Sequence, residues 1–125
     1  MHFCRACYSH FAGYQIQHED LIVDETKTKL LGTDWKSKFK YGMAEVGLRL
    51  QLADLLKCEI VNIEIQGKHY SVMVPPKADH HTGKETNEDK KYKIQAEKLG
   101  VAAGKLKWVH LRKSDVRSVL VVRAG

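Results

Sequence analysis

A chain of 125 residues, 43% hydrophobic and 29% charged, has the length of one domain and the composition of a folded globular protein, which excludes disordered and fibrous classes. Its 21 Lys and Arg against 15 Asp and Glu give a net charge of +6, which favours a polyanionic partner such as nucleic acid, DNA before RNA. No apolar run reaches the roughly 18 residues of a membrane span, and His2, Arg5 and His10 stand where a secretory signal would be apolar. We therefore expect a cytoplasmic protein without membrane contact.

The first part of the chain is expected to form short strands and turns over residues 1–33, with strands at His2–Tyr8 and Tyr14–Val23. From Asp34, a favourable N-cap, to about Lys57 the apolar spacing predicts one long helix, bent at Gly42 or Gly47. The stripe that defines it consists of Trp35, Phe39, Met43, Val46, Leu50 and Ala53, widened by Leu48, Leu52 and Leu55.

Cysteines and a histidine near the N-terminus suggest a metal site. Cys4-X2-Cys7 and the nearby His10 are typical of half a zinc site, which His18 or Cys58 would have to complete. The odd number of cysteines argues against a disulfide framework. The alternative to zinc is a pair of reduced cysteines in or beside a strand.

A hairpin is predicted next, because Ile60–Ile65 and Tyr70–Val74 are apolar and β-branched and a glycine turn separates them. The polar segment 75–91 is expected to be a mobile loop. A second, shorter helix follows from Glu88 to about Gly100, capped by Asn87, and the last strands are expected at Leu106–Leu111 and Ser118–Arg123. The sequence therefore predicts a single α+β domain over residues 1–125, with a small mixed β-sheet, a long helix and a second helix.

Polar residues on the packing faces of these elements suggest a site. If Gly67-Lys68 forms the hairpin turn, Glu64, Gln66, His69 and Ser71 share one sheet face. Two further carboxylates lie on the packing sides of the helices, Glu45 on the long helix and Asp89 on the second. A divalent metal is one partner for such charges. An ion pair between Asp89 and Lys93, four residues later, is another.

Three stretches together resemble a known family: residues 63–70, the helix start Asn87-Glu88-Asp89, and Lys107-Trp108-Val109-His110-Leu111. In sequence and in the order of elements, residues 40–115 are similar to endonucleases of the very-short-patch-repair type in the PD-(D/E)xK superfamily. The resemblance implies a restriction-endonuclease-like, nuclease-like core over residues 34–123. It also implies hydrolysis of nucleic-acid phosphodiesters.

Carried over to this chain, the resemblance implies a Mg²⁺ or Mn²⁺ site on Glu64 together with Glu45, Glu59 or Asp54. It implies that His69 acts as general base or as a donor to the phosphate, with Asp89 orienting it. The chain departs from the family in two places. The strand lacks the usual Asp, and Gln66 stands where an acidic residue or His is common. Phosphate contacts would come from the neighbouring lysines: Lys68, Lys84, Lys90, Lys91 and Lys93.

Three functional hypotheses follow. The first is a metal-dependent endonuclease or nickase with Glu45, Glu64, Gln66, His69 and Asp89 as its catalytic residues. The second is a noncatalytic basic module that binds nucleic acid, suggested by the missing strand Asp. The third is a small regulatory protein that binds another protein through a nuclease-like core. Nucleotide-dependent motors, dehydrogenases and serine hydrolases are excluded, because their phosphate-binding, dinucleotide-binding and nucleophile motifs are absent from the sequence.

Overall fold

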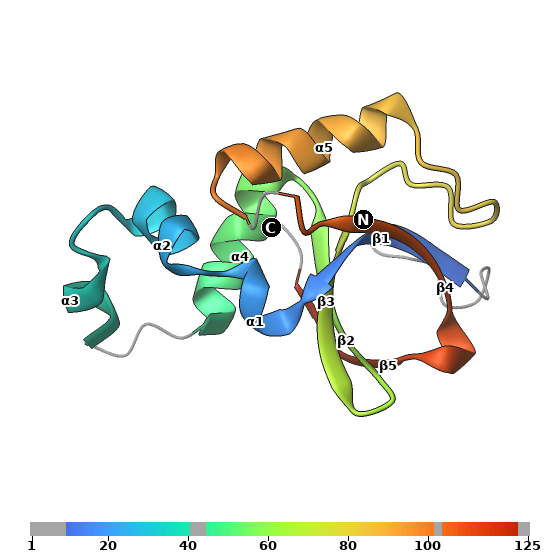
Figure 1. The fold of residues 1–125 in the computed structure, drawn as a ribbon, viewed down its shortest axis with the longest axis horizontal. Coiled ribbons are helices and arrows are strands. Elements are labelled where there is room, and N and C mark those ends of the chain that lie inside the picture. Colours follow the sequence, from blue (N-terminus) through green and yellow to red (C-terminus); the bar gives the residue numbers. More distant parts are fainter. Residues whose placement is uncertain (1–9, 41–44, 102–103, 123–125) are drawn as a thin grey trace.

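The computed structural model describes residues 10–40, 45–101 and 104–122; for 38–40, 45–46 and 118–122 it describes the backbone alone. It shows an α+β fold, which confirms the predicted class (Figure 1). The predicted strand at His2–Tyr8 lies outside the described residues. The elements in chain order are β1 (His10–Gln17), α1 (His18–Leu21), α2 (Asp24–Leu31), α3 (Trp35–Lys40), α4 (Glu45–Leu56), β2 (Glu59–Ile65), β3 (Lys68–Val74), α5 (Asn87–Lys98), β4 (Lys107–Arg112), the 3-10 turn η1 (Lys113–Asp115) and β5 (Arg117–Val122).

The strands form one sheet in the order β4-β1-β3-β2-β5. Each described ladder is antiparallel, in place of the mixed sheet that we expected. A short turn between β2 and β3 requires this direction, since a parallel neighbour needs a crossover of a dozen or more residues. The restriction-endonuclease-like core stays a prediction.

The sheet is strongly curled, because its two edge strands are joined by a very short connection. Five flat strands would place β4 and β5 about 19 Å apart. Only η1 and Val116 connect them, and a 3-10 turn rises by only about 2 Å per residue. The sheet therefore bends round on itself, and its ribbons outline a ring in Figure 1, with η1 linking the two edges.

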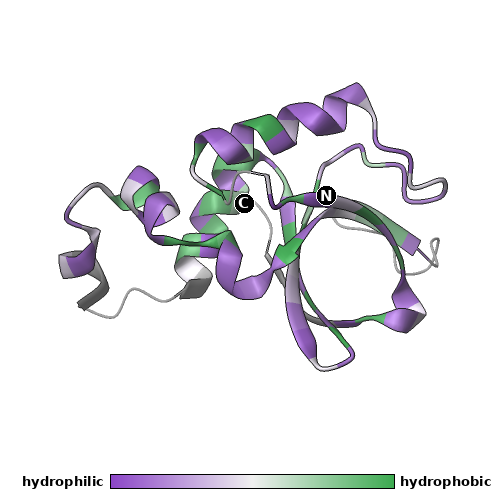
Figure 2. Ribbon diagram, in the orientation of Figure 1, coloured by the Kyte–Doolittle hydropathy of each residue, from purple (hydrophilic) through white to green (hydrophobic). Residues whose placement is uncertain are grey.

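Alternation along the strands gives the curled sheet two apolar faces. Tyr14, Ile60 and Met73 on the outer face pack with Leu48 and Leu52 of α4 in the larger core. The inner face has a core of its own, formed by Phe11, Val61, Ile63, Val72, Val74 and Ala78. In Figure 2 hydrophobic colour is prominent along α4, whereas α5 is largely hydrophilic.

The helical half of the chain differs from the prediction in two ways. Residues 18–31, expected as strand and turn, form α1 and α2, with Leu21, Thr26 and Leu31 buried. The long helix expected from Asp34 to Lys57 is described as two helices, α3 and α4. Within α4 the buried face is set by Leu48, Leu52 and Leu56 at helical spacing, so that Leu50 and Leu55 are exposed.

The β2–β3 turn is formed by Gln66-Gly67, one residue earlier than expected. Both residues have positive φ, +50° and +81°, which is the pattern of a type I′ turn. Glu64 therefore lies opposite His69, and Ser71 lies opposite Asn62. The shift occurs because two left-handed residues match the right-handed twist of the strands.

The segment expected as a mobile loop is shorter than predicted, and its side chains contact the sheet. Helix α5 begins at Asn87 with Thr86 as its N-cap, so 87–91 are helical and Asn87 is not the cap. Before the helix, Ala78 and His80 are buried. The His80 Nδ1 accepts a hydrogen bond of 3.2 Å from the Ala12 N–H. The Trp108 Nε1 donates one of 2.7 Å to the Gly83 carbonyl.

Within the described residues, each helix is too short or too polar to cross a lipid bilayer.

Candidate functional site

The site predicted from the sequence is centred on the outer end of the β2–β3 hairpin. Glu64 and His69 face each other across the two strands, with 3.9 Å between Glu64 Oε1 and His69 Nε2. Their side chains are 34% and 57% exposed, so water reaches both. Gln66 lies in the turn itself and does not share their strand face. The structure therefore brings together Glu64 and His69 of the predicted catalytic set.

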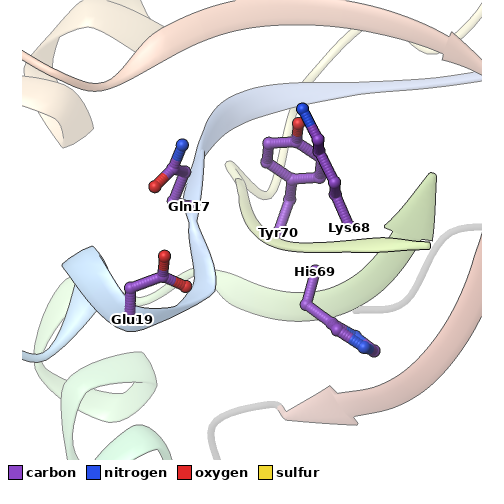
Figure 3. Close-up of a pocket in the computed structure, with 5 residues that line it drawn as sticks. All are labelled: Gln17, Glu19, Lys68, His69 and Tyr70. Carbon is purple, nitrogen blue, oxygen red and sulfur yellow. The ribbon is translucent and has the colours of Figure 1, made fainter. Parts of the chain in front are cut away.

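A shallow pocket of about 330 Å³ lies beside this pair, between the start of β3 and the β1–α1 junction. Figure 3 shows Lys68 and Tyr70 extending to one side of β3, towards Gln17, whereas His69 extends to the other side. Gln17 is paired with Tyr70 in the β1–β3 ladder, which fixes their proximity. Glu19 of α1 completes the lining. The pocket thus combines an amine, a phenol, an amide and a carboxylate.

Asp89 is not part of this cluster. It is 1% exposed and closes a capping box, in which its Oδ2 accepts bonds of 2.9 Å from the Thr86 N–H and 3.0 Å from the Thr86 hydroxyl. Its charge acts on Cys58, whose thiol pKa is raised chiefly by burial and then by Asp89. Cys58 precedes β2, and Glu64 is six residues further along, about 20 Å away in a strand. Asp89 therefore caps α5 and does not orient His69.

The other predicted metal ligands are also dispersed. Glu59 is buried and lies on the sheet face opposite to that of Glu64. Asp54 is exposed, and its Oδ1 lies 3.6 Å from the Lys57 Nζ. Glu45 is the first residue of α4, and its side chain lies outside the described part. Among the described residues, no three His, Cys, Asp or Glu side chains are placed to hold one metal ion, so their donors do not fit a preformed Mg²⁺ site.

The predicted zinc ligands divide between described and undescribed residues. Cys4 and Cys7 lie outside the described residues, and His10 begins β1. The ligands proposed to complete the site lie elsewhere. His18 follows the far end of β1 and accepts a bond of 2.9 Å at its backbone carbonyl from Arg49 Nη2. The buried Cys58 thiol donates to the Leu56 carbonyl at 3.4 Å.

Sequence reasoning missed a buried arginine of α4, whose side chain reaches the sheet face that carries Asn62, Glu64 and Ser71. Arg49 of α4 is 1% exposed, and its Nη1 donates to Asn62 Oδ1 at 3.2 Å and to Ser71 Oγ at 2.8 Å. The polar character of this face, taken as a sign of catalysis, thus partly reflects a structural network. A signal was present, because Arg49 precedes Leu52, Ala53 and Leu56 by three, four and seven residues, the spacing of one helix face.

The predicted phosphate-binding lysines fall into two groups. Lys68 lies at the hairpin pocket. The other four lie before and along the first half of α5, with Lys84, Lys90 and Lys91 exposed and Lys93 partly exposed. Comparison with models of known families, with curated proteins and with solved structures finds no match to this chain.

Proposed function

We propose that the protein binds nucleic acid without cleaving it, through a basic ridge formed by Lys84, Lys90, Lys91 and Lys93. The observation that carries the proposal is the inward orientation of Glu85 and Asp89, two of the three acidic residues in this segment. Their charges are engaged inside the fold. The outward side of the segment therefore carries a larger excess of positive charge than the residue composition of the segment indicates.

Each of the two acidic residues has a defined partner. The Tyr14 hydroxyl donates a hydrogen bond of 2.5 Å to Glu85 Oε2. Burial, followed by this bond to Glu85, raises the pKa of Tyr14, so the phenol remains a donor at neutral pH. Asp89 is held by Thr86 in the capping box. Glu88 alone stays exposed among the four lysines, which leaves an outward excess of positive charge.

A ridge of lysines recognises the phosphate backbone and not the base sequence. Four phosphate contacts on duplex DNA predict that log K falls with log salt at a slope of about −3.6. Affinity is then expected to fall roughly 100-fold between 50 and 200 mM salt. A smaller slope of about −2.8 is expected for single strands.

The test is fluorescence anisotropy of the full chain with labelled duplex DNA, single-stranded DNA and RNA across that salt range. The double variant Lys90→Glu/Lys91→Glu should lose most of the affinity and flatten the salt slope. The matched control is Lys29→Glu/Lys36→Glu, which makes the same change in net charge on exposed residues of α2 and α3, on the other side of the molecule (Figure 1). Equal losses in both double variants, or no binding at 50 mM salt, would refute the proposed ridge. Absence of binding at 50 mM salt would favour the hypothesis of a regulatory protein that binds another protein.

The metal-dependent endonuclease is a second candidate, and the Glu64–His69 pair favours it. A neutral imidazole exposed to water can accept a proton, and a carboxylate at 3.9 Å can stabilise the imidazolium that forms. Lys68 lies beside His69 in sequence and lines the same pocket. We derive no metal step, since the described carboxylates do not gather around this pair.

Cleavage is tested on plasmid, single-stranded DNA and RNA with Mg²⁺, with Mn²⁺ and with chelator. Glu64→Gln and His69→Ala should each abolish any metal-dependent cleavage, whereas Glu88→Gln and His81→Ala, on exposed residues elsewhere, should retain it. Intact substrates in every metal would reject the nuclease and leave the proposed binding function unaffected. Cleavage that survives both hairpin substitutions would place the chemistry elsewhere.

A further inference from the structure

A second surface cavity lies where η1 joins the two edge strands of the curled sheet. Its volume is about 380 Å³, and its lining comes from β1, the end of β2, β4 and the segment that contains η1. This volume is at the lower end of the range of about 300–1,000 Å³ that is typical of small-molecule sites. A ligand of the size of one nucleotide therefore fits the cavity.

One side of the cavity carries an arginine that is already oriented. The Arg112 Nε donates a hydrogen bond of 3.2 Å to Asp115 Oδ2, and both residues line the cavity. This bond uses Nε, so the two terminal nitrogens of the guanidinium remain as donors. Such a pair of N–H groups matches two oxygens of a phosphate. The Asp115 side chain is 61% exposed, so water screens its charge from an anion in the cavity.

Two histidines line the cavity beside this arginine. In the β1–β4 ladder His10 lies opposite Arg112 and His110 lies opposite Ala12, so the three side chains share one sheet face. The centroids of the two imidazole rings are 4.9 Å apart. An imidazole takes up a proton near neutral pH, and a phosphate monoester gives up its second proton at a pKa of about 6. A ring and a monoester can therefore share one proton. A phosphodiester has no such proton, so the pair favours a terminal phosphate.

The loop before α5 holds the His110 ring in place. The His110 Nε2 lies 3.0 Å from the His80 backbone carbonyl, which can only accept a hydrogen bond, so Nε2 carries a proton. Gly83, at φ +68°, lies so close to the ring that a Cβ at position 83 would overlap it. The imidazole is thus positioned before any ligand arrives, and Nδ1 is the nitrogen that can exchange a proton.

The remaining lining is apolar. Ile65, Leu111 and Val116 are partly buried, pack against the inner core and line the cavity. A bare phosphate gains little from such contacts, whereas a nucleoside attached to the phosphate buries apolar surface against them. We propose that the cavity binds the phosphate monoester of a nucleoside, with the phosphate at Arg112 and the two imidazoles. A free nucleotide and the phosphorylated end of a nucleic-acid strand share this chemistry. The proposal does not depend on the lysine ridge.

The experiment follows the amide NMR shifts of the isotopically labelled full chain during titration with AMP, UMP, adenosine and inorganic phosphate. Both nucleotides should give saturable shifts centred on Ile65 and on residues 110–116, with a Kd of about 1 mM or tighter. Adenosine and inorganic phosphate should each bind at least about 10-fold more weakly, because each lacks one half of the ligand.

Two substitutions test the phosphate contacts. Arg112→Met and His110→Gln should each weaken AMP binding at least about 10-fold. Gln keeps an amide donor for the His80 carbonyl but has no nitrogen that exchanges a proton at neutral pH. The matched control is Arg117→Met, which removes an exposed arginine that lies opposite Glu64 and does not line the cavity. It should retain the affinity. Circular dichroism verifies that each variant is folded.

Single strands with a 5′-phosphate and with a 5′-hydroxyl, compared at 200 mM salt, distinguish the two sources of the ligand. Tighter binding of the phosphorylated strand would identify a strand end, and equal binding of the two strands would identify a free nucleotide. Binding of AMP is measured without any strand, so failure of the lysine ridge leaves its result unchanged.

Absence of saturable shifts at about 10 mM nucleotide would overturn the proposal, as would shifts centred on α5. Equal affinities for AMP and adenosine would show that the cavity does not recognise the phosphate. Equal affinities for AMP and inorganic phosphate would show that it does not recognise the nucleoside. Equal losses in Arg112→Met and Arg117→Met would reduce the effect to net charge and refute the site.

Discussion

At the scale of single residues, the protonation of the Cys58 thiol links burial to stability. The side chain is 3% exposed, and burial, followed by the nearby Asp89 charge, raises the pKa of the thiol from 9.0 to about 12. Above pH 9 the unfolded chain loses this proton while the folded chain keeps it. The unfolded state is then stabilised, so the free energy of unfolding falls as the pH rises from about 9 towards 12.

We predict that raising the pH from 8.5 to 9.5 lowers the free energy of unfolding by roughly 0.7 kcal/mol through this thiol alone. The measurement is urea unfolding of the wild type and of Cys58→Ala at both pH values. The variant is less stable throughout because it leaves a small cavity, but its pH dependence should be smaller by that amount. The same pH dependence in both proteins would show that Cys58 does not ionise on unfolding in this range.

Residue-scale predictions from the sequence succeeded where local periodicity decides them. Strand alternation correctly placed Glu64, His69 and Ser71 on one face, and helix spacing correctly placed Asp89 on the packing side of α5. The partners of these residues depend on contacts that periodicity does not contain. Asp89 caps its own helix, and Ser71 accepts a hydrogen bond from a buried arginine.

At the scale of secondary-structure elements, the hairpin that carries Glu64 and His69 depends on its turn. Gln66 has a φ of +50°, which a side chain with a Cβ disfavours. Asn tolerates this conformation better and is the preferred first residue of a type I′ turn before Gly. We predict that Gln66→Asn raises the free energy of unfolding by up to about 1 kcal/mol, measured by urea unfolding.

The control for the turn is Gln66→Ala, which lacks the local hydrogen bonds that let Asn adopt positive φ. It should be no more stable than the wild type. If Asn and Ala at this position give the same stability, the left-handed conformation of residue 66 is not what limits the hairpin.

Element boundaries were predicted best where turn chemistry marks them. The strands of the hairpin and the two closing strands were found within about two residues. The helices between residues 18 and 31 were missed because they are short and tertiary contacts hold them. Thr26, for example, is fully buried and donates a bond of 2.8 Å to the Gly100 carbonyl, 74 residues away.

At the scale of the whole molecule, curling of the sheet decides which residues meet. The order β4-β1-β3-β2-β5 places the last two strands on opposite edges and brings them back together through η1. No local pattern encodes this closure. Sequence spacing therefore could not predict that the rings of His10 in β1 and His110 in β4 lie with their centroids 4.9 Å apart. The positions of Asp54, Glu59 and Asp89 were not predictable either, because each lies in a helix or strand but the arrangement of these elements depends on tertiary contacts.

Arg49 joins three parts of this architecture, since it bonds α4 to β2, β3 and the start of α1. Replacing it with Met keeps the apolar stem but leaves the buried oxygens of Asn62 and Ser71 without this donor. We predict that Arg49→Met lowers the free energy of unfolding by about 3 kcal/mol or more, measured by urea unfolding. Arg112→Met, on an exposed arginine, should change it by no more than about 0.5 kcal/mol. Equal effects of the two substitutions would mean that apolar packing holds α4 on the sheet without the arginine.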